Sequence, residues 1–360
     1  MSEKTKVGII FGGLSLESEV SLTSGRNLYN NINKTLFDPI AIYISRDEQF
    51  WQLPETLIIR NTTKEIEERL EAKAILIEYE KLASIIDIAF LVTHGKFGDD
   101  GSLQGLMELL HVPYTGSGVL SAALGMDKDL QRKLIGLDKD INQPEYLTVN
   151  IIDWQANQDR VINSIEQKFV YPLVSKPARE GSTIGVETIN SKDEFINKVK
   201  KSFIYDNKII IEPYLKGREF SCMVVGGDKP RALLPTETIH SNEIFTYDEK
   251  YLPGASEKIT PMDIDENIIK EIQRQSLACY IILGCSDYAR IDGFVLDNNK
   301  VVITDPNSAA STGLGPSSWT WHQAVKAGYS VKDFITELIN ISQKSQTNKK
   351  YAINTINQLI

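Results

Sequence analysis

Two acidic side chains and an amide lie in neighbouring apolar segments late in the chain. Asp292 follows ARI in the segment ARIDGFV, while Asp305 and Asn307 close the segment VVITDPN. Residues two apart on a strand point to the same face, so Asn307 accompanies Asp305 and Arg290 accompanies Asp292. Carboxylate and amide oxygens are hard ligands of the kind that hold Mg²⁺ against nucleotide phosphates. Acids that face inward need a metal or an arginine as partner, whereas acids that face solvent would form no site.

Glycine and hydroxyl side chains form the loop REGSTIG, Arg179–Gly185, between two strand-like segments. Backbone N–H groups of such a loop can point at a phosphate, because glycine has no Cβ to block the approach. Lys176, on the strand just before the loop, would add a positive charge. The loop could equally be a plain hairpin, and it is not a Walker A loop, because GxxxxGK[ST] is absent from the chain.

The segment IEPYLKGREF has the chemistry of a slot for a nucleotide base. Glu212, Tyr214 and Leu215 lie where an apolar strand turns, and Glu219 follows the turn. A base needs an apolar slot with backbone groups on an extended edge, and a carboxylate suits ribose hydroxyls. A strand, a glycine turn and an exposed glutamate also occur together without a ligand, so this segment alone decides nothing.

Two further segments, GGLSLESEVSL and THGKFGDDGSLQGLMELL, carry polar residues where apolar strands end. Ser15 and Glu17 stand at the start of a helix, where N–H groups point at a ligand, although Ser and Glu are also ordinary helix caps. His94 follows a hydrophobic strand at the edge where α/β sheets hold their ligands. A single histidine there is otherwise more often a structural hydrogen-bonding residue.

The elements that must position these residues fall into three parts. Alternating strand-like and helix-like patterns over residues 1–124 predict an open parallel α/β domain. Residues 125–207 mix helices with two strands around the glycine loop, which predicts a small α+β subdomain. Residues 208–360 hold an antiparallel succession of strands, a helix at Glu266–Leu283 and a closing helical stretch. The polar segment Asn242–Thr260, punctuated by Gly and Pro, is long enough to serve as an active-site lid.

The composition narrows the class of protein. The chain has 360 residues, 42% hydrophobic and 24% charged, which suits two or three soluble domains. A net charge of −9, with lysine and arginine scattered, argues against a nucleic-acid-binding protein. Three cysteines without metal-type spacing are typical of a reducing compartment. There is neither a signal peptide nor an apolar run of about 20 residues, which predicts a cytoplasmic protein that does not enter membranes.

The order of the motifs along the chain is more specific than any one of them. GGLSLESEVSL, HGKFGDDGSLQGLMELL, MDKDLQRKL, SKPAREGSTIGV, IIIEPYLKGREF, DEKY, ARIDG and DPN follow one another as they do in the D-alanine–D-alanine ligases of the ATP-grasp superfamily. The chain resembles this family from about Lys6 to Ile335. The resemblance implies an ATP-grasp fold behind an N-terminal α/β domain, and ligation of two D-amino acids through an acyl phosphate. Its most direct implication is D-alanyl-D-alanine synthesis for peptidoglycan, by a homodimer that joins through its N-terminal domain.

The same resemblance implies roles for particular residues. Glu17 would hold the ammonium group of the first amino acid near His94, and Ser182 would link Glu17 to a lid tyrosine, Tyr251. Arg290 would stabilise the oxyanion of the tetrahedral intermediate. The residues expected to bind ATP are Lys128, Lys176, Glu180, Glu212, Tyr214, Leu215, Glu219 and, at the γ-phosphate, Lys250. The residues expected to hold two Mg²⁺ ions, or Mn²⁺ in their place, are Asp292, Asp305 and Asn307.

The chain departs from the family's pattern mainly at one end of this site. Where the family has ExNTxPGMTxxS, this chain has DPNSAASTGLGPSSWTW. The glutamate becomes Asp305, and the Pro-Gly pair becomes Ala310 and Ser311, in a stretch about two residues longer. In the family this loop binds the carboxylate of the second substrate. Ser317 or Ser318 would take the place of its serine, and the sequence leaves the choice open.

The altered loop leaves the second substrate open among D-alanine, D-serine, another amino acid and an amine. Tyr251 favours an amine as nucleophile, because a resemblance to D-lactate-type enzymes would suggest phenylalanine there. A non-catalytic ATP-binding homologue is a further alternative, although such a protein would not need Lys128, Lys176 and Arg290 intact. An ATP-grasp carboxylase or purine-type synthetase is disfavoured by the HGKFGDDGSLQG block.

Overall fold

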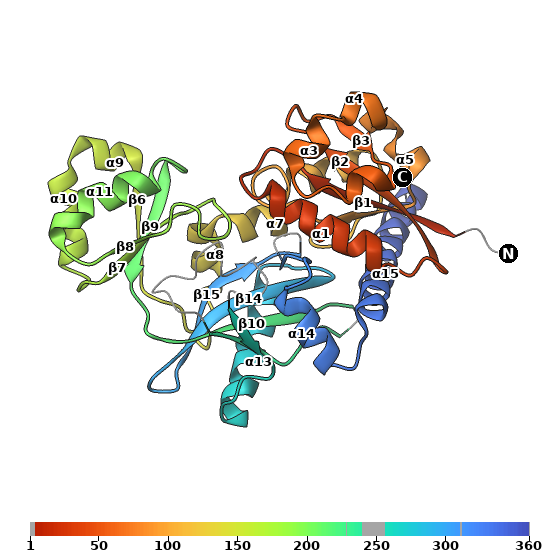
Figure 1. Cartoon of the computed structure of the whole chain (residues 1–360). Helices are drawn as coiled ribbons and strands as arrows, with labels where there is room; N and C mark the ends of the chain where they lie inside the picture. Colours follow the sequence, from red (N-terminus) through yellow and green to blue (C-terminus); the bar gives the residue numbers. More distant parts are fainter. Residues whose placement is uncertain (1–3, 228, 240–255, 310–311, 360) are drawn as a thin grey trace.

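The computed structural model describes residues 4–227, 229–239, 256–309 and 312–359, with the backbone only for residues 346–359. Its strands form sheets of five, four and six strands, which lie around a central junction (Figure 1). This is the predicted combination of α/β and α+β architecture. Within the described residues, no helix is both long and apolar enough to cross a bilayer.

The N-terminal sheet has the strand order β4-β3-β2-β1-β5. Its strands are β1 (Thr5–Gly12), β2 (Phe37–Ile44), β3 (Phe50–Gln52), β4 (Ile75–Ile77) and β5 (Ile88–Leu91). The accompanying helices are α1 (Ser18–Asn31), α2 (Glu55–Ile58), α3 (Thr63–Glu67), α4 (Leu70–Lys73), the 3₁₀ turn η1 (Tyr79–Lys81), α5 (Leu82–Ile85), α6 (Ser102–Leu109) and α7 (Val119–Met126). Strands β1, β2 and β5 run parallel, but β3 pairs antiparallel with both β2 and β4, which differs from the open parallel sheet predicted here. The connection between β2 and β3 is too short for the crossover that a parallel pair requires.

The middle sheet has the order β6-β9-β7-β8 and is antiparallel throughout. Its strands are β6 (Leu147–Asn150), β7 (Leu173–Pro177), β8 (Glu187–Ile189) and β9 (Lys208–Pro213). The helices of this part are α8 (Lys128–Ile135), α9 (Ile151–Ala156), α10 (Gln158–Glu166) and α11 (Lys192–Ser202). Strand β9 pairs here, although the sequence-based boundary at residues 207/208 assigned it to the C-terminal domain. Strand pairing alone does not define domains, so the three-domain division stays a prediction.

The C-terminal sheet has the order β13-β12-β10-β14-β15, with β11 paired to β10, and every pair is antiparallel as predicted. Its strands are β10 (Gly217–Val225), β11 (Arg231–Ala232), β12 (Thr236–Ile239), β13 (Glu257–Ile259), β14 (Tyr288–Leu296) and β15 (Val301–Asn307). The helices of this part are α13 (Glu266–Ile282), α14 (Trp319–Lys326) and α15 (Val331–Leu359).

The C-terminal helix α15 ties the first and last parts of the chain together. Figure 1 shows α15 beside α1 and β1. Phe334 and Leu338 of α15 are fully buried in the same apolar cluster as Val7 and Phe11 of β1. Burial of apolar surface stabilises a protein by roughly 25 cal/mol per Å². This shared core therefore holds the N-terminal sheet above the C-terminal sheet, where the loops of both can meet.

Candidate functional site

The register of the C-terminal sheet sets the acidic residues side by side. Asp292 of β14 lies opposite Asp305 of β15, and Arg290 lies opposite Asn307. On the other side of β14, Ser221 of β10 lies opposite Asp292. Side chains alternate along a strand, so all of these residues point to one face of the sheet. The placement expected from the two-residue spacing is therefore present.

The Asp292 carboxylate is the centre of this polar group. The Arg290 guanidinium donates to it from Nε at 3.0 and 3.1 Å and from Nη2 at 2.8 Å, and Asn307 Nδ2 donates at 2.9 Å. Burial raises the pKa of Asp292, while Arg290 opposes that rise. A buried carboxylate of this kind calls for positive charge. Among the described residues no cluster of three or more His, Cys, Asp and Glu side chains could hold a metal, so the available donors are two carboxylates and one amide.

A cavity of about 330 Å³ opens between the middle and C-terminal sheets. Six of the residues predicted to bind ATP line it, and they come from α8, β7, β9, β10 and the turn between β9 and β10. These six residues are Lys128, Lys176, Glu212, Tyr214, Leu215 and Glu219. Val174, Val186 and Phe294 add apolar surface, and Asp292 and Asp305 stand in its lining. The cavity thus combines an apolar slot with cations and acids, as a nucleotide requires.

Glu212 is held by two cations inside this cavity. Lys176 Nζ lies 2.5 Å from Oε1, and the Arg132 guanidinium pairs with Oε2. Burial alone would raise the pKa of Glu212, but Arg132 and Lys176 outweigh it and lower the pKa, so the carboxylate stays charged. Arg132 also donates to the Thr304 carbonyl at 3.1 Å. Arg132 was not predicted from the sequence, although its position four residues after Lys128 on α8 places both on one helix face.

A second, small cavity of about 30 Å³ lies where the three parts of the chain meet. Most of the residues predicted for the first substrate and the chemistry line it, and Trp319, which was not predicted, lines it too. The predicted residues in its lining are Glu17, His94, Lys128, Glu180, Ser182, Arg290, Asp305 and Asn307. Its free volume corresponds to about two water molecules, and it adjoins the larger cavity through Lys128, Ser182 and Asp305.

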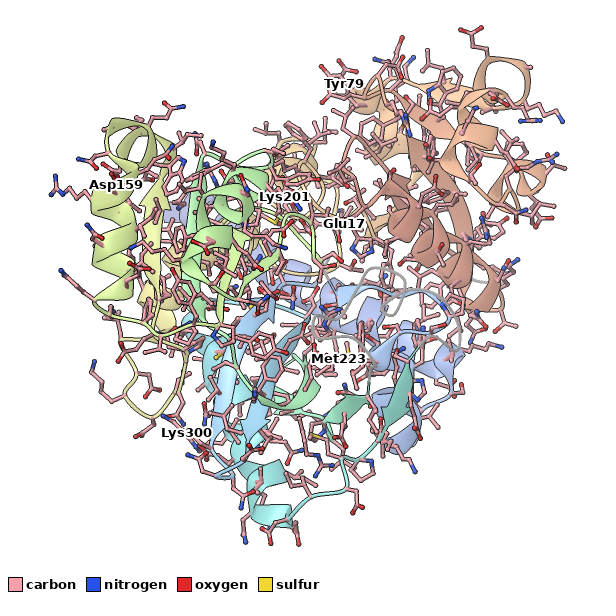
Figure 2. The ribbon with its side chains drawn as sticks, turned by 60° about the vertical axis from the view of Figure 1, so that its left-hand side comes forward. Glu17, Tyr79, Asp159, Lys201, Met223 and Lys300 are labelled. Carbon is pink, nitrogen blue, oxygen red and sulfur yellow. The ribbon has the colours of Figure 1, made fainter. Side chains whose placement is uncertain are left out.

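Glu17 reaches this cavity from the start of α1, close to the glycine loop. Its side chain is buried, and Figure 2 shows it at the junction of the N-terminal and middle parts. A Cβ on Gly181 would collide with the Glu17 carboxylate, and one on Gly95 would lie 3.1 Å from Oε2. Gly95 also has φ +74°, in the left-handed region that glycine favours. Glycines at 95 and 181 therefore let two loops close directly over Glu17.

The glycine loop presents Ser182 and Glu180 from the middle part. Ser182 has φ +53°, and its buried hydroxyl has no hydrogen-bond partner among the described residues. The Glu180 carboxylate pairs with Lys96, and its carbonyl accepts from Lys128 Nζ at 2.7 Å. Tyr251, the predicted partner of Ser182, and Lys250 lie outside the described residues.

His94 is buried and neutral. Burial, and then the nearby charge of Arg290, lower the pKa of His94 to about 3. Its Nε2 lies 3.3 Å from Ser24 Oγ on α1. The imidazole therefore acts as an uncharged hydrogen-bonding group on the cavity wall at neutral pH.

The two serines proposed for the second substrate lie outside both cavity linings. Ser318 caps α14: its hydroxyl accepts from the Thr320 N–H at 3.2 Å and donates to the Gly313 carbonyl at 2.6 Å. Ser317 is half-buried. Trp319, which directly follows Ser318, reaches the small cavity. It was not predicted, because no local signal in the sequence marks it.

Comparison with known proteins agrees with this geometry. Models of the D-ala D-ala ligase N-terminus and C-terminus match residues 6–117 and 136–340. The chain is 31% identical to the D-alanine–D-alanine ligase of Natranaerobius thermophilus, over 96% of this chain and 97% of that protein. The chain belongs to the D-alanine–D-alanine ligase family. It is also 32% identical to D-alanine–D-alanine ligase A of Escherichia coli K12, over 94% of this chain and 96% of that one.

Solved structures of the D-alanine–D-alanine ligase family share the fold. The D-alanine–D-alanine ligase of Coxiella burnetii covers 99% of both chains with a TM-score of 0.84 and 26% identity. The VanG D-Ala:D-Ser ligase of Enterococcus faecalis covers 94% of this chain and 100% of its own, with a TM-score of 0.81 and 31% identity. The protein is thus an ATP-dependent ligase with an ATP-grasp fold.

Proposed function

We propose that the protein joins two molecules of D-alanine, using ATP, and so supplies a dipeptide for peptidoglycan. One observation carries the proposal: Lys128, Ser182 and Asp305 line both the larger cavity and the smaller one. ATP in the larger cavity would therefore meet, at this shared wall, the carboxylate of an amino acid whose ammonium group is held by Glu17. Relatives named D-alanine–D-alanine ligase, 31–33% identical over nearly the whole chain, support D-alanine as the substrate.

The reaction needs activation before the peptide bond can form. A carboxylate is a poor acyl donor because its leaving group would be oxide. Transfer of the γ-phosphoryl group to the first amino acid gives an acyl phosphate, and the amine of the second amino acid attacks it and expels phosphate. Negative charge develops on the carbonyl oxygen during this attack, and Arg290, which lines the smaller cavity, would stabilise it. Acyl phosphates hydrolyse readily, so a closed cavity protects the intermediate.

Magnesium fits the donors at the shared wall. Asp292, Asp305 and Asn307 offer only oxygen ligands, and two Mg²⁺ ions there would neutralise charge on the phosphates. Lys128 Nζ, 3.7 Å from Asp305 Oδ1, adds a cation on the same side. Lys250 at the γ-phosphate and Tyr251 beside Ser182 belong to this proposal, as do a cytoplasmic location and a homodimer joined through the N-terminal domain.

An ADP-release assay over a panel of D- and L-amino acids tests the proposal. D-alanine should stimulate ADP release, mass spectrometry should detect D-alanyl-D-alanine, and Glu17→Gln should weaken binding of the first D-alanine. Chelation of divalent ions should stop the reaction, and Mg²⁺ should restore it. A D-alanyl-D-serine product in place of D-alanyl-D-alanine would contradict the assignment of the second substrate. Binding of ATP without ADP release on any amino acid, unchanged by Glu17→Gln, would instead favour a non-catalytic protein.

A further inference from the structure

Trp319 forms a fixed wall of the small cavity. It is the first residue of α14, its side chain is 6% exposed, and it lines the cavity with Arg290 and Asn307. The indole Nε1 donates to Thr238 Oγ1 on β12 at 2.7 Å, so the ring cannot turn without losing a buried hydrogen bond. Trp319 directly follows the loop in which this chain departs from its family's pattern. A large, fixed side chain therefore lies next to the loop that differs from the family's pattern.

Lys258 brings a second cation to the same ring. The Lys258 ammonium lies 5.2 Å from the centre of the Trp319 ring, and the Arg290 guanidinium lies 5.0 Å from it. In the strand register, Lys258 of β13 lies opposite Thr238 of β12, and Thr238 lies opposite Glu219 of β10. Residues opposite one another point to the same face of a sheet, so Lys258 shares the face that carries the larger cavity.

The charge of Lys258 is not matched by an acid in the described part of the chain. Its ammonium donates to Ser256 Oγ at 3.3 Å, and no carboxylate there lies within ion-pair distance. Burial lowers the pKa of Lys258, and the pKa of His322, one turn after Trp319, is lowered by burial and by the charge of Lys258. A half-buried ammonium that has no acidic partner among the described residues can bind an anion.

We propose that Trp319 and Lys258 select the second amino acid, Lys258 by binding its carboxylate and Trp319 by limiting the size of its side chain. This inference rests on the proposed function. Glu17, which suits the ammonium of the first substrate, lines the small cavity together with Arg290 and Trp319, and Lys258 lies 5.2 Å from the centre of the Trp319 ring. The amine of the second substrate must face the acyl phosphate at the shared wall, so its carboxylate would point away from that wall, toward Trp319 and Lys258. A long side chain on the second substrate would meet the indole.

The role of Trp319 is tested with mixed substrates. D-alanine is supplied with equal D-norvaline, and mass spectrometry with fragmentation identifies the residue at each end of the dipeptides. Trp319→Leu should raise the ratio of D-alanyl-D-norvaline to D-alanyl-D-alanine about tenfold or more, the range set by a methylene or two in an apolar pocket. The N-terminal residue should stay alanine, and Trp319→Phe should lie between. Trp321→Leu removes a buried tryptophan that packs on Phe334 and is the control: it should lower stability but leave the ratio unchanged.

The role of Lys258 is tested by the KM of the second D-alanine, separated from that of the first by the two phases of the D-alanine dependence. Lys258→Met should raise it about tenfold, the typical cost of one charge-assisted bond, while the KM for ATP stays within twofold. Lys258→Arg should restore most of the affinity. Lys300→Met, at the exposed end of the same sheet (Figure 2), is the matched control and should behave like the natural protein.

The outcomes separate this inference from the proposed function. If the natural protein makes D-alanyl-D-alanine but Trp319→Leu and Lys258→Met keep its product ratio and KM, the proposed function stands and the inference is wrong. If the natural protein joins no D-amino acids, both fall. If it prefers D-serine as the second residue, the same ratios and KM values are measured with D-serine, and unchanged values again overturn the inference.

Discussion

The larger cavity, which we propose binds the nucleotide and call the nucleotide cavity, is walled mainly by strands. The smaller cavity, which we propose binds the amino acids and call the amino-acid cavity, is walled mainly by loops and helix starts. Lys176, Glu212 and Glu219 stand on β7, β9 and β10, where strand pairing fixes their positions. In the smaller cavity, Glu17 and Trp319 begin helices from opposite ends of the chain.

The difference shows why one end of the site keeps its family's pattern and the other does not. A residue in a paired strand cannot move without shifting its neighbours, because a one-residue slip turns every side chain to the other face. A loop between elements tolerates insertions and substitutions far better. The two extra residues and the altered sequence before Trp319 fall in such a loop, so the second-substrate end can change while the nucleotide end stays intact.

A substitution beside the wall that the two cavities share should have the largest effect on the rate of the reaction. Arg290→Gln should lower kcat by about 10²–10³-fold, the cost of losing one group that stabilises a developing oxyanion. The KM for ATP should change much less than kcat, because Arg290 lines only the smaller cavity and reaches the larger one only through its ion pair with Asp292. ADP release at saturating ATP and D-alanine gives kcat, and its dependence on the ATP concentration gives the KM for ATP.

Arg218→Gln is the matched control for this change. Arg218 also lies on the C-terminal sheet and also pairs with a carboxylate, that of Glu237, but it lines neither cavity. Its loss should leave kcat within about twofold, since a partly exposed ion pair contributes little. A similar fall in kcat for both variants would show that the loss comes from the fold and not from the reaction.

A substitution beside the larger cavity should change ATP binding and the stability of the fold. Arg132→Met would leave the buried Glu212 with Lys176 as its remaining cation, and breaking a buried ion pair costs about 3–5 kcal/mol. We expect a lower free energy of unfolding in urea and a KM for ATP raised about tenfold, with a smaller change in the KM for D-alanine. Lys133→Met, next in the chain but with an exposed side chain, should change stability by less than about 0.5 kcal/mol. An unchanged KM for ATP in Arg132→Met would mean that Glu212 does not need Arg132 to serve the nucleotide.

The same contrast explains what the sequence could and could not predict. Residues on paired strands were found from local spacing: the placement of Asp292, Asp305 and Asn307 follows from the two-residue period. Arg132 was missed because its partner, Glu212, is 80 residues away and on another element. Lys258 and Trp319 were missed because neither has a local signal. They come together only in the folded chain, where Trp319, at the start of α14, donates to Thr238 of β12 and Lys258 lies over its ring. The antiparallel edge of the N-terminal sheet was not predicted, because short apolar strands have the same sequence pattern in either direction.

The smallest effect is expected from His94, in the smaller cavity, on the pH dependence of the free energy of unfolding. His94 has a pKa near 3 in the folded protein, whereas an unfolded histidine titrates near 6.5, so only the unfolded chain takes up this proton as the pH falls below 6.5. The stabilisation is therefore fully present above pH 6.5 and declines toward pH 3. Between pH 7 and pH 5 it amounts to about 2 kcal/mol, and His94→Asn should remove that share of the acid loss measured by urea unfolding. His322→Asn, at a histidine whose pKa is lowered by partial burial and by Lys258, should remove a smaller share. An equal acid loss in the natural protein and in His94→Asn would mean that His94 can take up a proton in the fold, and so that the amino-acid end is more open to water than its burial indicates.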